Sequence, residues 1–256
     1  MKLGICTNKD FDAVARAGYD YIETAFCLLV EQSADEFAAY KKSILDTGLK
    51  AETFNCFFRG DVALVGEKVD LKLIADFARK GMQRAAQLGG EVAVIGSGAA
   101  RTIPDSCNRK QAVEQFVSVL DLCAGIAGEY GMKIVVEPLN AKETNFVNTV
   151  AEGLELARMV NNPNVGGLVD FYHAHLSGES LEAVETAGDA LFHAHLARAN
   201  ADRDIPVTSQ DLETCKRWAQ ALKTCGYDKR LSLECIHSRS FEESIIAARP
   251  AMELFL

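Results

Sequence analysis

No cysteine of this chain stands in a C-x-x-C pair, although the 256 residues include eight cysteines. A chain of this length needs no disulfides to hold its core, so we expect reduced thiols, as in a cytoplasmic protein. The N-terminus MKLGICTNKD lacks the apolar stretch of a secretory signal. No apolar run approaches the roughly 18 residues of a membrane-spanning helix. We therefore expect a cytoplasmic protein with no membrane partner.

Positive charge is also scarce, with 27 Lys and Arg against 36 Asp and Glu and a net charge of −9. An acidic surface repels phosphate backbones and anionic lipids, so we expect no nucleic-acid partner. A G-x-G-x-x-G motif is absent after the first predicted strand, which argues against a dinucleotide cofactor. The segment IGSGAART, residues 95–102, contains only a Gly-Ser-Gly, which is a weak signal. The composition suits a protein that handles small neutral molecules.

Short β-branched runs alternate with longer helical patterns along the whole chain. The predicted strands are 2–6, 19–24, 49–55, 91–96, 132–137, 165–170, 191–197 and 230–235. The clearest helical patterns cover 70–89, 112–131, 148–164 and 208–226. Strands that alternate with helices predict a parallel sheet with right-handed crossovers. Eight such units in a chain of this length predict an α/β fold, a single (β/α)8 TIM barrel over residues 1–256. A doubly wound open sheet is the alternative.

The last four predicted strands end on polar side chains. They carry, in chain order, Glu137, Asp170, the pair His193 and His195, and Glu234. Chemistry in such barrels sits at the C-terminal ends of the strands, so these side chains are expected to meet at one rim. A set in which oxygen outnumbers nitrogen suits a hard or borderline divalent ion such as Mn²⁺, Mg²⁺ or Co²⁺. The ion would compensate three carboxylates placed near a core.

Three stretches resemble a known family: VVEPLNAKETNFVNT, GLVDFYHAH, and HAHLARANADRDIP with RLSLEC after it. The sequence resembles the xylose isomerase-like TIM barrel (sugar phosphate isomerase/epimerase) superfamily and, within it, the D-tagatose/D-psicose 3-epimerase group. The resemblance covers most of the chain and is clearest from Met132 to Cys235. It implies one divalent metal ion, Mn²⁺ in the first place, with the ligands Glu137, Asp170, His195 and Glu234.

The same resemblance implies three substrate-binding residues. Glu143 lies six residues after the first ligand, His173 lies three residues after the metal-binding aspartate, and Arg203 lies in DRDIP. Of the two histidines on the seventh strand, the family pattern selects His195. Strand alternation puts His193 on the same side, deeper in the barrel. The resemblance also implies a homo-oligomer, either a dimer or a tetramer, that acts on a small sugar.

The implied chemistry is proton transfer beside a carbonyl. One glutamate removes the C3 proton of a ketose, a cis-enediolate forms, and a second glutamate returns a proton to the opposite face. Glu137 and Glu234 are the expected catalytic pair, because inversion needs carboxylates on both faces. No glycine-rich phosphate cradle follows the last two strands. The resemblance therefore implies C3 epimerisation of a free ketose, with a sugar phosphate as the alternative substrate.

Other activities on the same metal site stay open. An aldose–ketose or hydroxypyruvate-type isomerase would move a proton between C1 and C2. An inosose- or dehydroshikimate-type dehydratase would expel a hydroxyl group β to the carbonyl. A metal-dependent apurinic endonuclease shares this barrel, but five histidines and a net charge of −9 disfavour it. A non-catalytic barrel that holds a metal would exchange no ketose proton.

Overall fold

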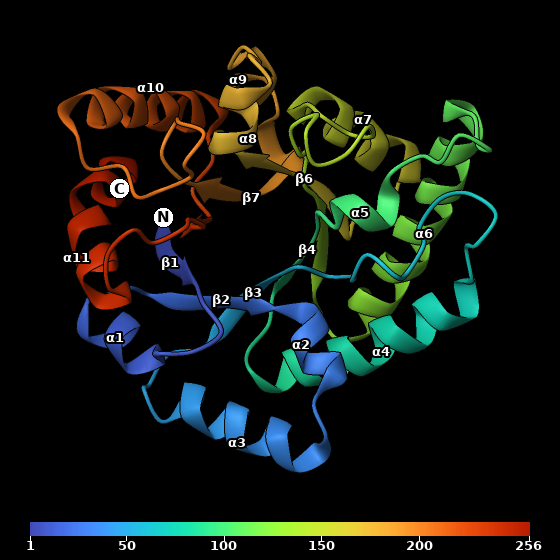
Figure 1. The fold of residues 1–256 in the computed structure, drawn as a ribbon, viewed down its shortest axis with the longest axis horizontal. Helices are drawn as coiled ribbons and strands as arrows, with labels where there is room; N and C mark the ends of the chain where they lie inside the picture. The colour runs from blue at the N-terminus through green and yellow to red at the C-terminus, as the bar shows by residue number, and fades with distance from the viewer.

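Eight parallel strands close into a barrel, in chain order, in the computed structural model, which describes residues 1–256 (Figure 1). The strands are Lys2–Cys6 (β1), Tyr21–Ala25 (β2), Ala51–Asn55 (β3), Val92–Ile95 (β4), Lys133–Val136 (β5), Val165–Asp170 (β6), Leu191–Leu196 (β7) and Arg230–Leu233 (β8). The first strand pairs with the last, with Ile5 opposite Leu233. This closure confirms the predicted (β/α)8 barrel and excludes the open doubly wound sheet.

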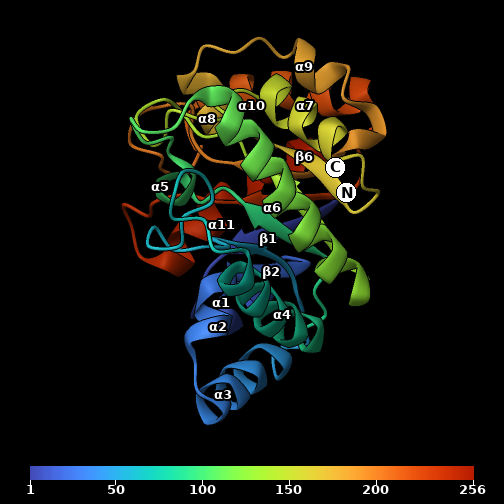
Figure 2. The same cartoon turned by 90° about the vertical axis from the view of Figure 1, so that its right-hand side faces the viewer.

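Helices form a ring around the barrel (Figures 1 and 2). The longer ones are α3 (Ala34–Leu45), α4 (Leu71–Gln87), α6 (Arg109–Glu129), α7 (Val150–Val160), α10 (Ser209–Cys225) and α11 (Phe241–Met252). The shorter ones are α1 (Phe11–Arg16), α2 (Phe26–Glu31), α5 (Gly98–Arg101), α8 (Phe171–Leu176), α9 (Glu182–Glu185), η1 (Gly188–Ala190) and η2 (Glu253–Phe255). None of these helices combines the length and the hydropathy that a bilayer-spanning segment requires.

Side-chain caps fix the starts of the helices that the sequence predicts best. Asp70, Asn108, Thr149 and Thr208 each accept a hydrogen bond from a backbone N–H in the first turn of α4, α6, α7 and α10. Gly226, with a φ of 76°, ends α10 in the left-handed conformation. The four predicted helical patterns therefore correspond to these four helices.

The barrel interior changes from apolar to polar along the strands. Val94, Val135 and Leu168 pack together in an apolar layer. Two residues after Val135 and Leu168, the same alternation places Glu137, which directly follows β5, and Asp170, which ends β6. Both carboxylates are 5% exposed or less. Because every second side chain of a strand faces the barrel interior, the strands that supply the apolar layer also supply the carboxylates of the polar site.

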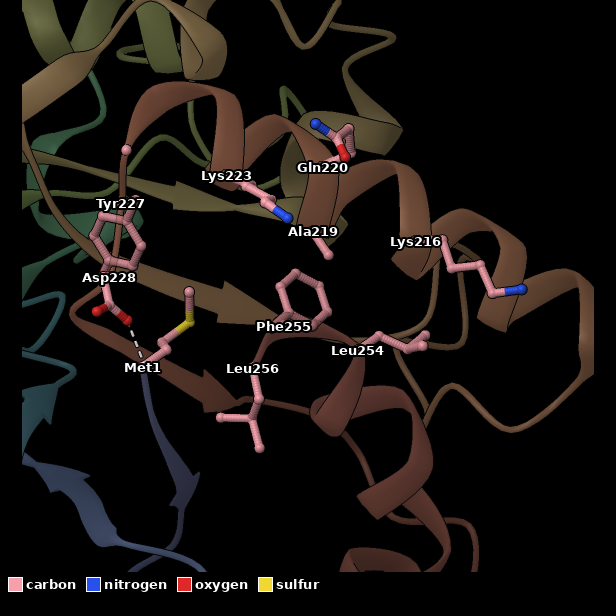
Figure 3. A pocket seen from close by; sticks show the side chains of 11 residues that line it. Met1, Lys216, Ala219, Gln220, Lys223, Tyr227, Asp228, Leu254, Phe255 and Leu256 are labelled. Atoms are coloured by element: carbon pink, nitrogen blue, oxygen red, sulfur yellow. Dashed lines mark ion pairs between the residues drawn. The ribbon is translucent and has the colours of Figure 1, made fainter.

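The other end of the barrel holds the two termini side by side (Figures 1 and 3). The N-terminal ammonium lies 2.5 Å from Asp228 Oδ1. A cavity of about 450 Å³ opens there between α10 and the C-terminal residues, lined by Met1, Phe255 and Leu256 among others. This cavity lies at the N-terminal ends of β1 and β8 and contains none of the predicted site residues.

Candidate metal and active site

The four predicted metal ligands converge at the C-terminal rim of the barrel. Glu137 follows β5, Asp170 ends β6, His195 lies on β7 and Glu234 follows β8. One donor atom from each lies within 4.8 Å of the others. His195 Nδ1 is 3.1 Å from Glu137 Oε1, 3.2 Å from Glu234 Oε2 and 3.9 Å from Asp170 Oδ2. The structure therefore brings together side chains that are up to 97 residues apart in the sequence (234 − 137).

The hydrogen bonds of His195 indicate that this cluster fits a cation. Its Nε2 lies 2.9 Å from the buried carboxylate of Glu23, so the ring proton belongs on that nitrogen. In the neutral ring, Nδ1 then presents a lone pair to three carboxylates, which repel one another unless a positive charge lies among them. A divalent ion with mostly oxygen ligands satisfies this donor set. The same carboxylates attract a proton to Nδ1: burial opposes protonation of the ring, but Glu23 and Glu234 outweigh it and raise the pKa of His195 well above its usual range, so a metal ion bound at Nδ1 would take the place of that proton.

Glu137 and Glu234 differ in their electrostatic surroundings. Burial and the nearby charge of Glu234 raise the pKa of Glu137. Burial acts on Glu234 as well, but the positive charges of His195 and Arg203 outweigh it and lower the pKa of Glu234 to about 2. The guanidinium of Arg203 lies 2.5 Å from Glu234 Oε2 and 3.1 Å from Asp170 Oδ2. The two glutamates therefore differ in how readily each gains a proton.

The residues predicted to contact a substrate border the same cluster. His173, on α8, is 1% exposed, and its Nδ1 lies 3.2 Å from the backbone nitrogen of Asn140. Its Nε2 has no hydrogen-bond partner and lies 3.8 Å from Asp170 Oδ2. Asn140 Nδ2 donates to Glu143 Oε1 at 3.0 Å, which places Glu143 beside the histidine. With Arg203, all three predicted residues lie around the metal cluster, and the nitrogen of His173 that faces Asp170 is buried without a hydrogen-bond partner.

Sequence reasoning missed Glu23, which lies within β2 and is fully buried. Its carboxylate accepts hydrogen bonds from Thr53 Oγ1 at 2.7 Å and Ser232 Oγ at 2.5 Å. The Nε2 atoms of His193 and His195 lie 2.8 and 2.9 Å away, so His193 lies in the interior network, as predicted. Burial raises the pKa of Glu23, but the two histidines outweigh it and the net shift is downward. The one available signal was a charged residue, Glu23, inside the predicted strand 19–24.

The sequence also carried no indication that Asn55 belongs to the site. Asn55 ends β3, and its Nδ2 donates to Glu234 Oε1 at 2.8 Å. This bond orients the carboxylate so that Oε2 faces His195 and Arg203. An amide at the end of a strand carries no sequence signal for such a contact, because most polar side chains there face solvent.

Gly96 leaves the space that Glu137 needs. A Cβ at position 96 would lie 2.0 Å from Glu137 Oε2. We therefore expect Gly96→Ala to displace the carboxylate and lower kcat about tenfold in the assay described below. Gly125→Ala, in α6, is the matched control, because nothing lies within 4 Å of its Cβ. A Gly96→Ala enzyme with the wild-type kcat would place Glu137 outside the reacting centre.

Comparisons with known proteins point to one family. A family model described as xylose isomerase-like TIM barrel matches residues 11–254. L-ribulose 3-epimerase from Methylomonas sp. (strain DH-1) is 29% identical over 198 residues, which are 75% of this chain and 66% of that protein. The match thus spans just under two thirds of this relative's length. Inosose isomerase from Bacillus licheniformis is 30% identical over an alignment of 271 residues, covering 94% of this chain and 89% of that protein.

A solved structure of D-allulose 3-epimerase from Methylomonas sp. shares the fold. The TM-score is 0.83 at 21% identity, and the match covers 100% of this chain and 98% of that chain. The curated relatives are named as epimerases and isomerases, which supports an isomerase or epimerase enzyme. The cluster of four side chains that could hold a metal ion is the site at which such an isomerase or epimerase reaction would take place.

Proposed function

Because this chain belongs to the xylose isomerase-like TIM barrel family, we propose that it is a divalent-metal-dependent epimerase that inverts C3 of a free ketose. The observation that carries the proposal is the placement of two glutamates. Glu137 comes from β5 and Glu234 from β8, and they reach His195 Nδ1 at 3.1 and 3.2 Å from different parts of the rim. Two carboxylates that flank one point can serve both faces of a bound sugar.

The proposed ligands of the ion are Glu137, Asp170, His195 and Glu234. A bound divalent ion supplies Lewis acidity, which polarises the carbonyl beside C3. We propose Mn²⁺ as the ion, with Mg²⁺ and Co²⁺ as alternatives, because three of the four ligands are carboxylates. A cytoplasmic location and a homo-oligomer of two or four chains stay predictions from the sequence.

The two glutamates do the proton chemistry in this proposal. A carboxylate oxygen of one glutamate takes the C3 proton on one face of the ketose, which leaves a cis-enediolate. The carboxylic acid of the other glutamate gives a proton to C3 on the opposite face, so the configuration inverts. The roles of Glu137 and Glu234 exchange when the reaction runs in the other direction.

Three further residues bind the substrate in this proposal. His173, through its unpartnered Nε2, and Arg203 donate to the oxygen on which negative charge develops. Glu143 accepts a hydrogen bond from a substrate hydroxyl. The charge of Arg203 is already taken up by Asp170 and Glu234, which supports a neutral sugar over a sugar phosphate.

The test is an NMR assay in D₂O with Mn²⁺-loaded protein and a panel of ketohexoses and ketopentoses. We expect deuterium at C3 together with the C3 epimer, and neither after the metal has been removed by a chelator. Label at C1 would instead identify an aldose–ketose isomerase. No exchange in any ketose would contradict the epimerase proposal.

One observation favours a second candidate. The inosose isomerase from Bacillus licheniformis aligns with nearly the whole of this chain and of its own. In that reading the same glutamates move a proton from the hydroxyl-bearing carbon next to the ketone of a cyclic polyol to the ketone carbon itself, so the carbonyl shifts by one position. An inosose belongs in the same NMR panel, and migration of its carbonyl without exchange in the ketoses would establish this candidate.

A further inference from the structure

The segment after β4, residues 96–102, contains a buried cation that the proposed mechanism does not use. Arg101, on α5, is 0% exposed and forms no ion pair with a carboxylate. Its Nε has no hydrogen-bond partner. Burial lowers the pKa of Arg101 to about 10, even though the charge of Glu137 opposes the fall. A guanidinium is costly to bury in this way, so its contacts need an explanation.

Arg101 donates to two backbone carbonyls on different segments. One terminal nitrogen lies 3.2 Å from the oxygen of Ile95, and the other lies 3.2 Å from the oxygen of Val147. The same two oxygens accept the backbone N–H groups of Glu137, at 3.2 Å, and Leu139, at 3.1 Å. Each of these two oxygens therefore accepts two hydrogen bonds, one from the guanidinium of Arg101 and one from a backbone N–H at one end of the turn 137–139.

The backbone of this turn is also held by Asn148, whose Nδ2 donates to the oxygen of Leu139 at 2.7 Å. The middle residue of the turn, Pro138, has no N–H to donate. Val147, whose oxygen anchors Leu139, has a φ of 61°, which is strained for a β-branched residue and needs support from its surroundings. Helix α5 also packs directly against the following loop, since a Cβ at Gly98 would lie 2.9 Å from Leu139 Cδ1. The planar fork of Arg101 thus adds a buried connection between the end of β4 and this loop, beside the more exposed hydrogen bonds of Thr102 with Thr144 and of Ile103 with Asn145.

We propose that Arg101 is a positioning residue that fixes the turn 137–139, and thereby aims the carboxylate of Glu137 and places Glu143 beside His173. The inference rests on the proposed function for the roles of Glu137 and Glu143. The contacts of the guanidinium with the two carbonyls are independent of that function. In the segment IGSGAART, the arginine then has a role of its own, in addition to the Gly-Ser-Gly noted in the sequence.

The first test is backbone hydrogen exchange in Arg101→Met and Arg101→Lys. Methionine removes every donor, and lysine keeps the charge but cannot span two carbonyls. We expect the amides of Glu137 and Leu139 to exchange at least about tenfold faster in both variants. Arg84→Met is the matched control, because the guanidinium of Arg84 on α4 also donates to backbone carbonyls, those of Leu29, Gln32 and Ser33, and contacts none of the site residues. Unchanged protection in folded Arg101→Met overturns the proposal.

The second test separates positioning from simple stability. We expect KM for the sugar to rise about tenfold and kcat to fall in Arg101→Met. Arg101→Lys should recover the melting temperature but not KM. If Arg101→Met fails to fold, Arg101→Lys gives both readouts. Faster exchange with unchanged KM and kcat would make Arg101 purely structural and overturn the proposal. Faster exchange in a protein whose wild type converts no ketose or inosose would refute the proposed function, while the fixing of the turn would stand.

Discussion

Glu137→Gln and Glu234→Gln should each lower the rate of C3 epimerisation by about a thousandfold at saturating Mn²⁺, with the fold intact. Glutamine keeps the size of the side chain and one oxygen for a metal, but it neither takes up nor releases the C3 proton. General acid–base groups contribute between about 10² and 10⁴ to such rates. The measurement is the appearance of the C3 epimer by NMR, with circular dichroism to check the fold.

The two variants should also fail in different ways. With one glutamate left, the enzyme can remove and return the proton on one face only. Each variant should therefore exchange the C3 hydrogen of one epimer for deuterium without inverting it, and the two variants should prefer opposite epimers. Loss of exchange with the same epimer in both variants would point to a single base.

The matched control is Glu52→Gln. Glu52 is as buried as Glu137, at 5% exposure, but pairs with Lys2 and Arg230 at 2.6 Å near the start of the barrel strands. Its substitution should lower stability and leave the epimerisation rate within about twofold of the wild type. Wild-type rates in Glu137→Gln and Glu234→Gln would remove both residues from the acid–base role.

The fold was predictable because its signals are local. Runs of β-branched residues mark the strands, and β1 and β6 begin and end where the sequence predicts. The fifth and eighth strands end earlier than predicted, at Val136 and Leu233. Their last predicted residues include Glu137 and Glu234, which turn toward the site at the rim, where pairing with the neighbouring strands ends. The rule that barrel chemistry lies at the C-terminal strand ends therefore predicted where these carboxylates meet better than the β-branched runs predicted the strand boundaries.

The site was predictable only in part, for a physical reason. Ligands at the ends of successive strands can be found because strand order in a barrel follows chain order. Glu23 is separated from His193 and His195 by 170 and 172 residues and meets them across the closed barrel. Arg101 recognises backbone carbonyls, which have no sequence signature. Residues that act through another side chain or through the backbone therefore appear only in the folded structure.

Glu23→Gln should weaken Mn²⁺ binding about 100-fold, because it reverses the hydrogen bond that sets the tautomer of His195. The two carboxylate oxygens of Glu23 face the Nε2 atoms of His193 and His195 at 2.8 and 2.9 Å. Glutamine offers one acceptor and one donor, so one imidazole has to face an N–H. Where that ring is His195, its proton moves from Nε2 to Nδ1, and the nitrogen beside Glu137 and Glu234 loses its lone pair.

The measurement is a calorimetric Mn²⁺ titration, supported by thermal unfolding with and without the ion. A 100-fold loss of affinity removes about 2.8 kcal/mol of the stabilisation that a saturating ion gives to the folded state. Tyr21→Phe is the control, because the Tyr21 hydroxyl lies 2.7 Å from Ser232 Oγ in the same network but contacts neither histidine. It should cost about 1 kcal/mol of stability and leave Mn²⁺ affinity unchanged. A folded Glu23→Gln protein that binds Mn²⁺ as tightly as the wild type would mean that Glu23 does not set the tautomer of His195.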